Sequence, residues 1–222
     1  MVETVLSLSD RRLYLCVGAR DDMSTFLPAA LRGGVDVVQL REKELDRSVQ
    51  APLARLMGVI CRDFEVPFVV NDSPELAYDV RADGVHVGQD DVPATEARAT
   101  IGDHALVGLS THASGELAAA VGGEGPGGPA PVDYLSAGPV VATPTKPGRP
   151  GTGPGYVELA VRQSPWPVWV TGGVGPDTVG DLVATGARHF VVVRWLVTAD
   201  DPRGAARRLR GRIDELLADR AD

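Results

Sequence analysis

PFVVNDSPELAYDVRADGVHVG, residues 67–88, holds two β-branched runs separated by one short helical segment. The runs at 67–71 and 84–88 have the length of buried strands, and apolar residues recur with helical spacing at 75–80. Ser73 and Pro74 stand immediately before that segment, in the order that begins many helices. The stretch therefore predicts one strand, helix and strand unit, whose two strands run parallel.

The same unit repeats along the chain in both directions. Candidate strands occupy residues 13–18, 35–40, 67–71, 84–88, 106–110, 133–138, 167–173 and 189–193. Segments with helical spacing of apolar residues occupy 25–31, 49–64, 75–80, 95–101, 116–121, 156–161, 178–184 and 205–217. Further helix-start signals stand at Ser24, Ser114, Pro176-Asp177 and Asp201-Pro202. Uniformly apolar strands, each followed by a helix, predict a parallel sheet covered on its outer side.

Eight such units within roughly 210 residues predict the α/β class and a single-domain (β/α)8 TIM barrel. The alternative is a doubly wound open sheet, which usually has fewer strands. That fold also carries a G-x-G-x-x-G turn after its first strand, whereas this chain reads Val17-Gly-Ala-Arg20 there. We expect an N-terminal extension at residues 1–12 and the barrel at residues 13–218.

Charge and composition exclude several classes of protein. The chain has 222 residues, 22 Lys and Arg against 30 Asp and Glu, and a formal net charge of -8. This acidic total argues against broad binding to nucleic acid or to an anionic membrane surface, although it permits a small cationic pocket. No cationic lead into an apolar segment and no run of membrane-spanning length is present, so we expect a cytoplasmic protein. Two cysteines predict reduced core thiols rather than a disulfide framework. The sequence leaves the oligomeric state open, with a homo-oligomer as one option.

The second predicted strand ends in long polar side chains. Gln39, Arg41 and Lys43 are spaced by two residues, which puts all three on one face of an extended strand. Inside a barrel mouth, two cations and an amide require an anion to neutralise them. The alternative is that the strand has already ended and that residues 41–44 form a solvated charge run.

Carboxylates follow the third and fourth predicted strands. Asp72 comes after Asn71, and Asp91 lies just beyond the run at 84–88. Carboxylate oxygens suit Mg²⁺, which usually binds one or two carboxylates together with phosphate oxygens of a substrate. The alternative for each aspartate is a helix N-cap, because a proline follows two residues later in both cases. His86 should point inward, where we expect it to support a binding residue rather than contact the ligand.

Two later segments have the composition of anion-binding loops. Thr143, Thr145 and Lys146 lie in a proline-rich loop after the sixth strand, where hydroxyls and an ammonium supply phosphate contacts. Gly172-Gly173 ends the seventh strand, and Val193-Arg194 ends the eighth. Phosphate sites in these barrels often form after strands seven and eight, where glycine lets backbone N–H groups approach the anion.

These motifs resemble the thiamine phosphate synthase (thiamine-phosphate pyrophosphorylase) family over residues 13–208. The matching motifs are Val38-Gln-Leu-Arg-Glu-Lys43, Val70-Asn-Asp72, Gly84-Val-His-Val-Gly-Gln-Asp-Asp91, Ser110-Thr-His112, Gly138-Pro with Thr143-Pro-Thr-Lys-Pro-Gly148, and Gly172-Gly173. The resemblance implies a (β/α)8 barrel enzyme that uses Mg²⁺. It joins 4-amino-2-methyl-5-hydroxymethylpyrimidine pyrophosphate to 4-methyl-5-(2-phosphoethyl)thiazole, forming thiamine monophosphate and releasing pyrophosphate by a dissociative displacement.

The resemblance also implies roles for individual residues. The residues that would hold the pyrimidine pyrophosphate are Gln39, Arg41, Lys43, Asn71, Ser110 and Lys146. Four of them would also be catalytic: Arg41, Lys43, Ser110 and Lys146. The metal would be held by Asp72 and Asp91. The thiazole phosphate would be held by Thr143, Thr145, Gly173, Val193 and Arg194. One departure is Arg194, because many relatives have Ser there. Two other readings remain, a thiazole tautomerase-like isomerase and a non-catalytic barrel that binds thiazole phosphate.

Overall fold

The computed structural model describes residues 7–122, 129–143 and 150–220. Within these residues the strands close into one parallel barrel in chain order, from β1 beside β2 round to β8 beside β1. The strands are β1 Leu13–Val17, β2 Val37–Leu40, β3 Phe68–Asn71, β4 Gly84–Val87, β5 Leu106–Thr111, β6 Tyr134–Ala137, β7 Val168–Val170 and β8 His189–Val192. The predicted (β/α)8 barrel is confirmed, and the doubly wound alternative is wrong.

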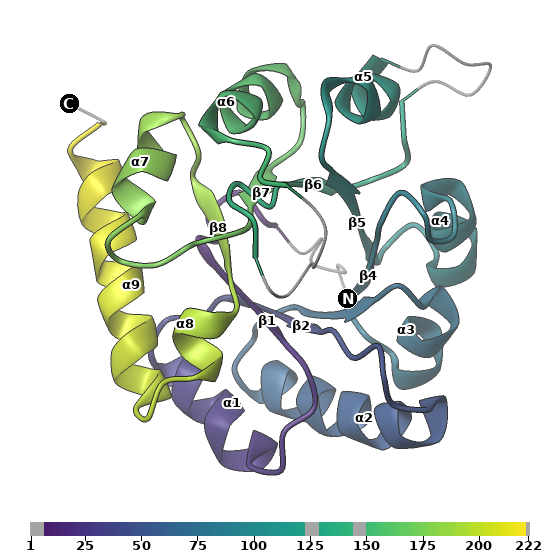
Figure 1. Ribbon diagram of the computed structural model, residues 1–222. Helices are drawn as coiled ribbons and strands as arrows, with labels where there is room; N and C mark the ends of the chain where they lie inside the picture. The colour runs from purple at the N-terminus through teal and green to yellow at the C-terminus, as the bar shows by residue number, and fades with distance from the viewer. Residues whose placement is uncertain (1–6, 123–128, 144–149, 221–222) are drawn as a thin grey trace.

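Helices form a ring outside the barrel (Figure 1). They are α1 Met23–Arg32, α2 Arg47–Asp63, α3 Pro74–Val80, α4 Ala94–Ile101, α5 Ser114–Gly122, α6 Pro154–Gln163, α7 Val179–Ala184, α8 Arg194–Val197 and α9 Pro202–Ala218. The short helix α8 was not predicted, because four residues are too few to show a periodicity. Within the described residues, no helix has both the length and the apolarity needed to cross a membrane.

Two of the predicted helix-start positions are wrong. Helix α1 is preceded by Asp22, whose carbonyl oxygen accepts from the backbone N–H of Phe26 at 2.9 Å, so Ser24 lies inside the first turn. Helix α7 is preceded by Thr178, because the residues before it form a turn in which the Thr178 hydroxyl donates to the carbonyl oxygen of Gly173 at 2.6 Å. Ser73 does cap α3, since its hydroxyl accepts from the backbone N–H of Leu76 at 3.1 Å.

The apolar core has two parts, separated by the barrel wall. The larger part lies between strands and helices, where Leu15, Val38 and Phe68 are fully buried or nearly so. The smaller part fills the barrel interior and consists of Leu8, Tyr14, Val37, Val69, Leu106, Tyr134 and Trp169. Alternation along each strand produces this division, because successive side chains point to opposite faces.

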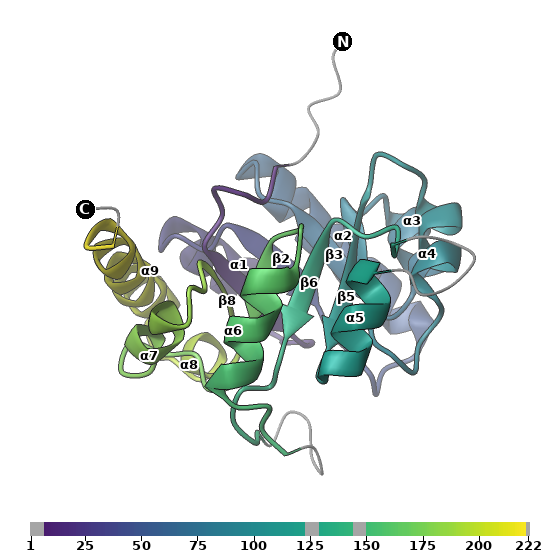
Figure 2. The same cartoon turned by 90° about the horizontal axis from the view of Figure 1, so that it is seen from above.

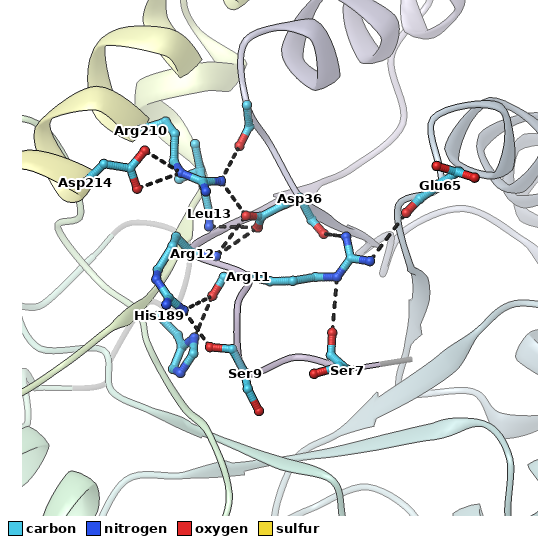
Figure 3. Close-up of polar contacts among 11 residues, drawn as sticks. Ser7, Ser9, Arg11, Arg12, Leu13, Asp36, Glu65, His189, Arg210 and Asp214 are labelled. Atoms are coloured by element: carbon cyan, nitrogen blue, oxygen red, sulfur yellow. Dashed lines mark hydrogen bonds and ion pairs between the residues drawn. The ribbon is translucent and has the colours of Figure 1, made fainter. Parts of the chain in front are cut away.

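The amino-terminal end of the barrel is closed by residues 7–12, which cross it on the side opposite α8 (Figure 2). Asp36, just before β2, holds this segment: its carboxylate accepts from the backbone N–H groups of Arg12 and Leu13, both at 2.9 Å at closest, and pairs with Arg210 of α9 (Figure 3). The Arg11 guanidinium donates to the Asp36 carbonyl oxygen at 2.9 Å. These bonds tie the segment to β2 and α9, leaving the opposite end of the barrel as the open mouth.

Candidate active site

A cavity of about 240 Å³ opens at the carboxyl ends of the strands. This is the end of a (β/α)8 barrel at which catalytic groups are placed. Eight of the site residues predicted from the sequence line this cavity: Gln39, Arg41, Asn71, Ser110, Thr143, Gly173, Val193 and Arg194. They come from positions far apart in the chain, so closure of the barrel is what brings them together.

The polar run after β2 divides into two parts. Gln39 is buried within the strand and Arg41 follows it, with its backbone N–H donating to the carbonyl oxygen of Val17 at 2.8 Å. Both side chains line the cavity. Lys43 lies beyond the end of the strand, where its side chain is 50% exposed and its ammonium is 2.7 Å from the carboxylate of Asp72. Because β2 ends at Leu40, Arg41 and Lys43 both lie beyond it, and the prediction that one strand face carries all three side chains is wrong, although Arg41 still lines the cavity.

Asp72 and Asp91 lie close enough at the mouth for their carboxyl groups to interact. Burial raises the pKa of Asp72, and Asp91 raises it further, whereas the neighbouring ammonium of Lys43 opposes the rise. The alternative that these aspartates are helix caps is wrong. Ser73 caps α3, and the residue before α4 is Pro93. Instead, the Asp91 carboxylate accepts from the backbone N–H of Gly88 at 2.7 Å and holds the loop after β4.

The donor set of these two residues suits a hard divalent cation. Two neighbouring carboxylates repel each other and attract a cation, and Mg²⁺ commonly takes one or two carboxylates with phosphate oxygens completing its shell. Across the described part of the chain, no group of three or more His, Cys, Asp and Glu side chains is arranged as a metal site. A cation here would therefore take its remaining ligands from water or from a substrate.

The opposite side of the mouth is made of backbone. Gly172 and Gly173 follow β7 with φ angles of 95° and 79°, a backbone conformation that residues with a Cβ atom rarely adopt. A Cβ at Gly172 would lie 2.6 Å from Pro139, so the glycine pair also allows the loop after β6 to approach. Val193 and the exposed Arg194 border the same space at the start of α8. Thr145 and Lys146 lie outside the described residues.

The floor of the cavity contains residues that the sequence motifs did not single out. Tyr14, Cys16, Tyr134 and Ser136 line it together with His86, which was expected to point inward. The signal that would have found them is their spacing by two residues along β1 and along β6, which places the hydroxyl and thiol groups of each strand on one face. Both cysteines are buried and neither forms a disulfide, as predicted. Cys16 nevertheless faces the cavity rather than the core between sheet and helices.

A barrel whose mouth gathers cations, paired carboxylates and a glycine turn defines the chain as a (β/α)8 barrel enzyme. The family described as thiamine monophosphate synthase matches residues 13–196, and the chain belongs to that family, a family of transferases of thiamine biosynthesis. It is 43% identical to a thiamine-phosphate synthase of Thermobifida fusca (strain YX), covering 93% of this chain and 94% of the relative. It is 42% identical to a thiamine-phosphate synthase of Acidothermus cellulolyticus, covering 93% and 97%.

The structure is also similar to a solved relative. A thiamine phosphate pyrophosphorylase from Pyrococcus furiosus superimposes with a TM-score of 0.81 at 27% sequence identity, covering 93% of this chain and 96% of that one. The agreement extends over almost the whole of both chains, so the two proteins share one fold.

Proposed function

We propose that this enzyme joins 4-amino-2-methyl-5-hydroxymethylpyrimidine pyrophosphate to 4-methyl-5-(2-phosphoethyl)thiazole, giving thiamine monophosphate and pyrophosphate. The observation that carries the proposal is the cavity at the barrel mouth, where eight residues implied by the family resemblance meet. Membership of the thiamine monophosphate synthase family supports the same reaction.

The leaving-group half of the site would lie along β2, β3 and β5. Arg41 and Lys43 would bind the pyrophosphate oxygens, while Gln39, Asn71 and Ser110 would hold the pyrimidine from the cavity wall. An arginine can engage two phosphate oxygens at once, and charge-assisted bonds of this kind strengthen as negative charge develops on the leaving group. Lys146, outside the described residues, would add a further cation.

Asp72 and Asp91 would hold Mg²⁺, which, when bound, supplies positive charge to the pyrophosphate. Lys43 already pairs with Asp72, so substrate binding would exchange one partner of this ammonium for phosphate oxygens. The negative charges of the two aspartates would then partly neutralise the cationic side chains and Mg²⁺, which lowers the free-energy cost of bringing these cations together.

The bond changes balance without a protein nucleophile. The C–O bond between the pyrimidine methylene and pyrophosphate breaks, and pyrophosphate departs with the electron pair. The thiazole nitrogen then donates its lone pair to the resulting carbocation and forms the new C–N bond. The chain's part is to orient both substrates and to stabilise separated charge with preorganised donors.

The thiazole phosphate would occupy the β7 and β8 side of the mouth. Gly173 and the backbone at Val193 offer N–H groups, Thr143 offers a hydroxyl, and Arg194 offers a guanidinium at the start of α8. Thr145, outside the described residues, would add a second hydroxyl. This arrangement would place the two phosphate groups on opposite sides of the cavity, with the reacting atoms between them.

The test is to incubate the protein with both substrates and Mg²⁺ and to measure pyrophosphate. Release that depends on the thiazole phosphate supports the synthase. Isomerisation of the thiazole without pyrophosphate release, or binding of thiazole phosphate without turnover, would overturn the proposal in favour of the isomerase or the binding barrel. Arg41→Ala should abolish release, whereas Arg47→Ala is the matched control, because Arg47 pairs with Asp79 on the outside of the barrel.

A further inference from the structure

A chain of hydrogen bonds crosses the floor of the cavity and joins two predicted substrate contacts, Gln39 and Ser110. The Gln39 amide donates to the Tyr14 hydroxyl at 3.2 Å, and the hydroxyl oxygens of Tyr14 and Tyr134 are 3.0 Å apart. The Tyr134 hydroxyl lies 3.2 Å from Nδ1 of His86, and Nε2 of His86 lies 2.9 Å from the Ser110 hydroxyl. All five side chains are buried.

The donor at one end of this chain selects a direction for the bonds along it. With Gln39 donating to Tyr14, each phenol proton has an acceptor within the chain only if Tyr14 donates to Tyr134 and Tyr134 donates to His86. Nδ1 of His86 is then an acceptor, so the neutral ring carries its proton on Nε2 and donates it to Ser110. The hydroxyl proton of Ser110 is thereby directed toward the cavity.

The other end of the chain supports the same direction. The Cys16 thiol donates to the Gln39 amide oxygen at 3.1 Å, which leaves the amide nitrogen to face Tyr14. Burial raises the pKa of Tyr14 and of Tyr134, so each phenol keeps the proton that the chain requires. In the reverse direction the amide nitrogen would face sulfur, which is only a weak acceptor.

Gly108 shows that the fold leaves space for this contact. It lies opposite Tyr134 in the register of β5 and β6, and opposite His86 in that of β4 and β5. A Cβ at Gly108 would overlap both the Tyr134 ring and Nδ1 of His86. Any larger residue would therefore separate the two groups whose hydrogen bond transmits the direction of the chain.

We propose that Tyr14, Tyr134 and His86 are positioning residues that hold Ser110 as a hydrogen-bond donor toward the substrate, and so select a planar heterocycle with a ring nitrogen acceptor. This inference rests on the proposed function, because the pyrimidine of the proposed substrate has such a nitrogen. The floor would thus recognise the ring, while the cations at the mouth recognise the pyrophosphate. Loss of a link should weaken binding of the substrate equally in its ground and transition states.

A double-mutant cycle between Tyr134 and Ser110 tests whether Tyr134 acts on substrate binding through Ser110. Tyr134→Phe should raise KM for the pyrimidine pyrophosphate about five- to tenfold with kcat nearly unchanged, the scale of one hydrogen bond. In a Ser110→Ala background the same substitution should have no further effect. The matched control is Tyr78→Phe, which removes a hydroxyl from an exposed ring and should leave KM unchanged.

The outcomes separate the two proposals. If Ser110→Ala impairs binding but Tyr134→Phe costs the same factor in both backgrounds, Tyr134 contacts the substrate directly and the positioning role is overturned. If Ser110→Ala has no effect, the assignment of the pyrimidine site is wrong. Tyr14→Phe, one link further from Ser110, repeats the cycle if Tyr134→Phe does not fold.

The tautomer of His86 can be measured in the free wild-type protein, independently of activity. In ¹⁵N-histidine-labelled protein, the ring of His86 should show a protonated Nε2 and an unprotonated Nδ1. In Tyr14→Phe the loss of the upstream donor should increase the population of the other tautomer. A wild-type ring protonated at Nδ1 would show the opposite direction and overturn the proposal.

Discussion

His189 should make the stability of the barrel fall as the pH is lowered below neutrality. It begins β8 at the closed end, where its side chain is 8% exposed and its Nδ1 lies 2.6 Å from the carbonyl oxygen of Arg11 (Figure 3). Burial lowers the pKa of His189 to about 4, and nearby Arg12 and Arg188 lower it further, whereas the Arg11 carbonyl and Asp10 oppose the shift. The folded chain therefore keeps a neutral imidazole that the unfolded chain would protonate.

The sign and size follow from proton linkage. Between the folded pKa of about 4 and the ordinary value of 6.5, the unfolded state binds more protons, so the free energy of unfolding rises with pH. The stabilisation is fully present above the unfolded pKa and is lost as the pH falls toward the folded one. From about pH 7 to about pH 5 the loss amounts to about 2 kcal/mol for this one group.

The assay compares urea unfolding of the wild type and His189→Gln at both pH values. Glutamine keeps an N–H donor for the Arg11 carbonyl but does not titrate, so the variant should lose about 2 kcal/mol less than the wild type over this interval. Burial raises the pKa of Asp36, which acts with the opposite sign, and the difference between the two proteins removes that contribution. Equal pH slopes for wild type and His189→Gln would refute the reasoning.

Three further substitutions test the mouth and the core. Asp91→Ala should raise the Mg²⁺ concentration for half activation about tenfold, since one ligand is lost; unchanged Mg²⁺ dependence would leave Asp91 only its bond to Gly88. Lys146→Ala should lower turnover by about 10² to 10³ with the melting temperature retained, because a charge-assisted contact to the leaving group is lost, and full turnover would remove Lys146 from the site. Phe68→Ala should lower the free energy of unfolding by about 3 to 5 kcal/mol, measured by urea titration, because it empties a fully packed position; a loss below about 1 kcal/mol would contradict the packing described for β3.

The fold could be predicted because the sequence of each strand and helix unit carries local signals for its own secondary structure. The run at 67–71, the cap at Ser73 and the run at 84–88 predict β3, α3 and β4 without reference to the rest of the chain. Closure into a barrel then needs only the number of units and the parallel direction. Helix α8 could not be predicted, since its four residues are positioned by their neighbours: the Trp195 indole donates to the carbonyl oxygen of Ala205 in α9 at 3.1 Å.

The lining of the candidate site could be predicted where burying a residue type costs free energy unless that residue has a partner. Arg41 and Asn71 stand out because long polar groups at strand ends need a partner. Tyr14 and Tyr134 do not stand out, because a tyrosine in an apolar strand is an ordinary core residue. Their hydroxyl contact joins positions 120 residues apart in sequence, so only the closed barrel shows it.

The two ends of the barrel use buried polar groups in different ways, and the difference explains where chemistry can occur. At the closed end, the Asp36 carboxylate receives two backbone N–H groups and a guanidinium, all from the chain itself. At the mouth, burial and a second carboxylate raise the pKa of Asp72, and its ammonium partner Lys43 is half exposed. A carboxylate already supplied with donors gains little from a ligand, whereas one beside a like charge is stabilised by any cation that arrives. The mouth therefore gains stability when a cation and an anionic substrate bind together, and Mg²⁺ with pyrophosphate should raise the melting temperature more than the sum of the two added separately.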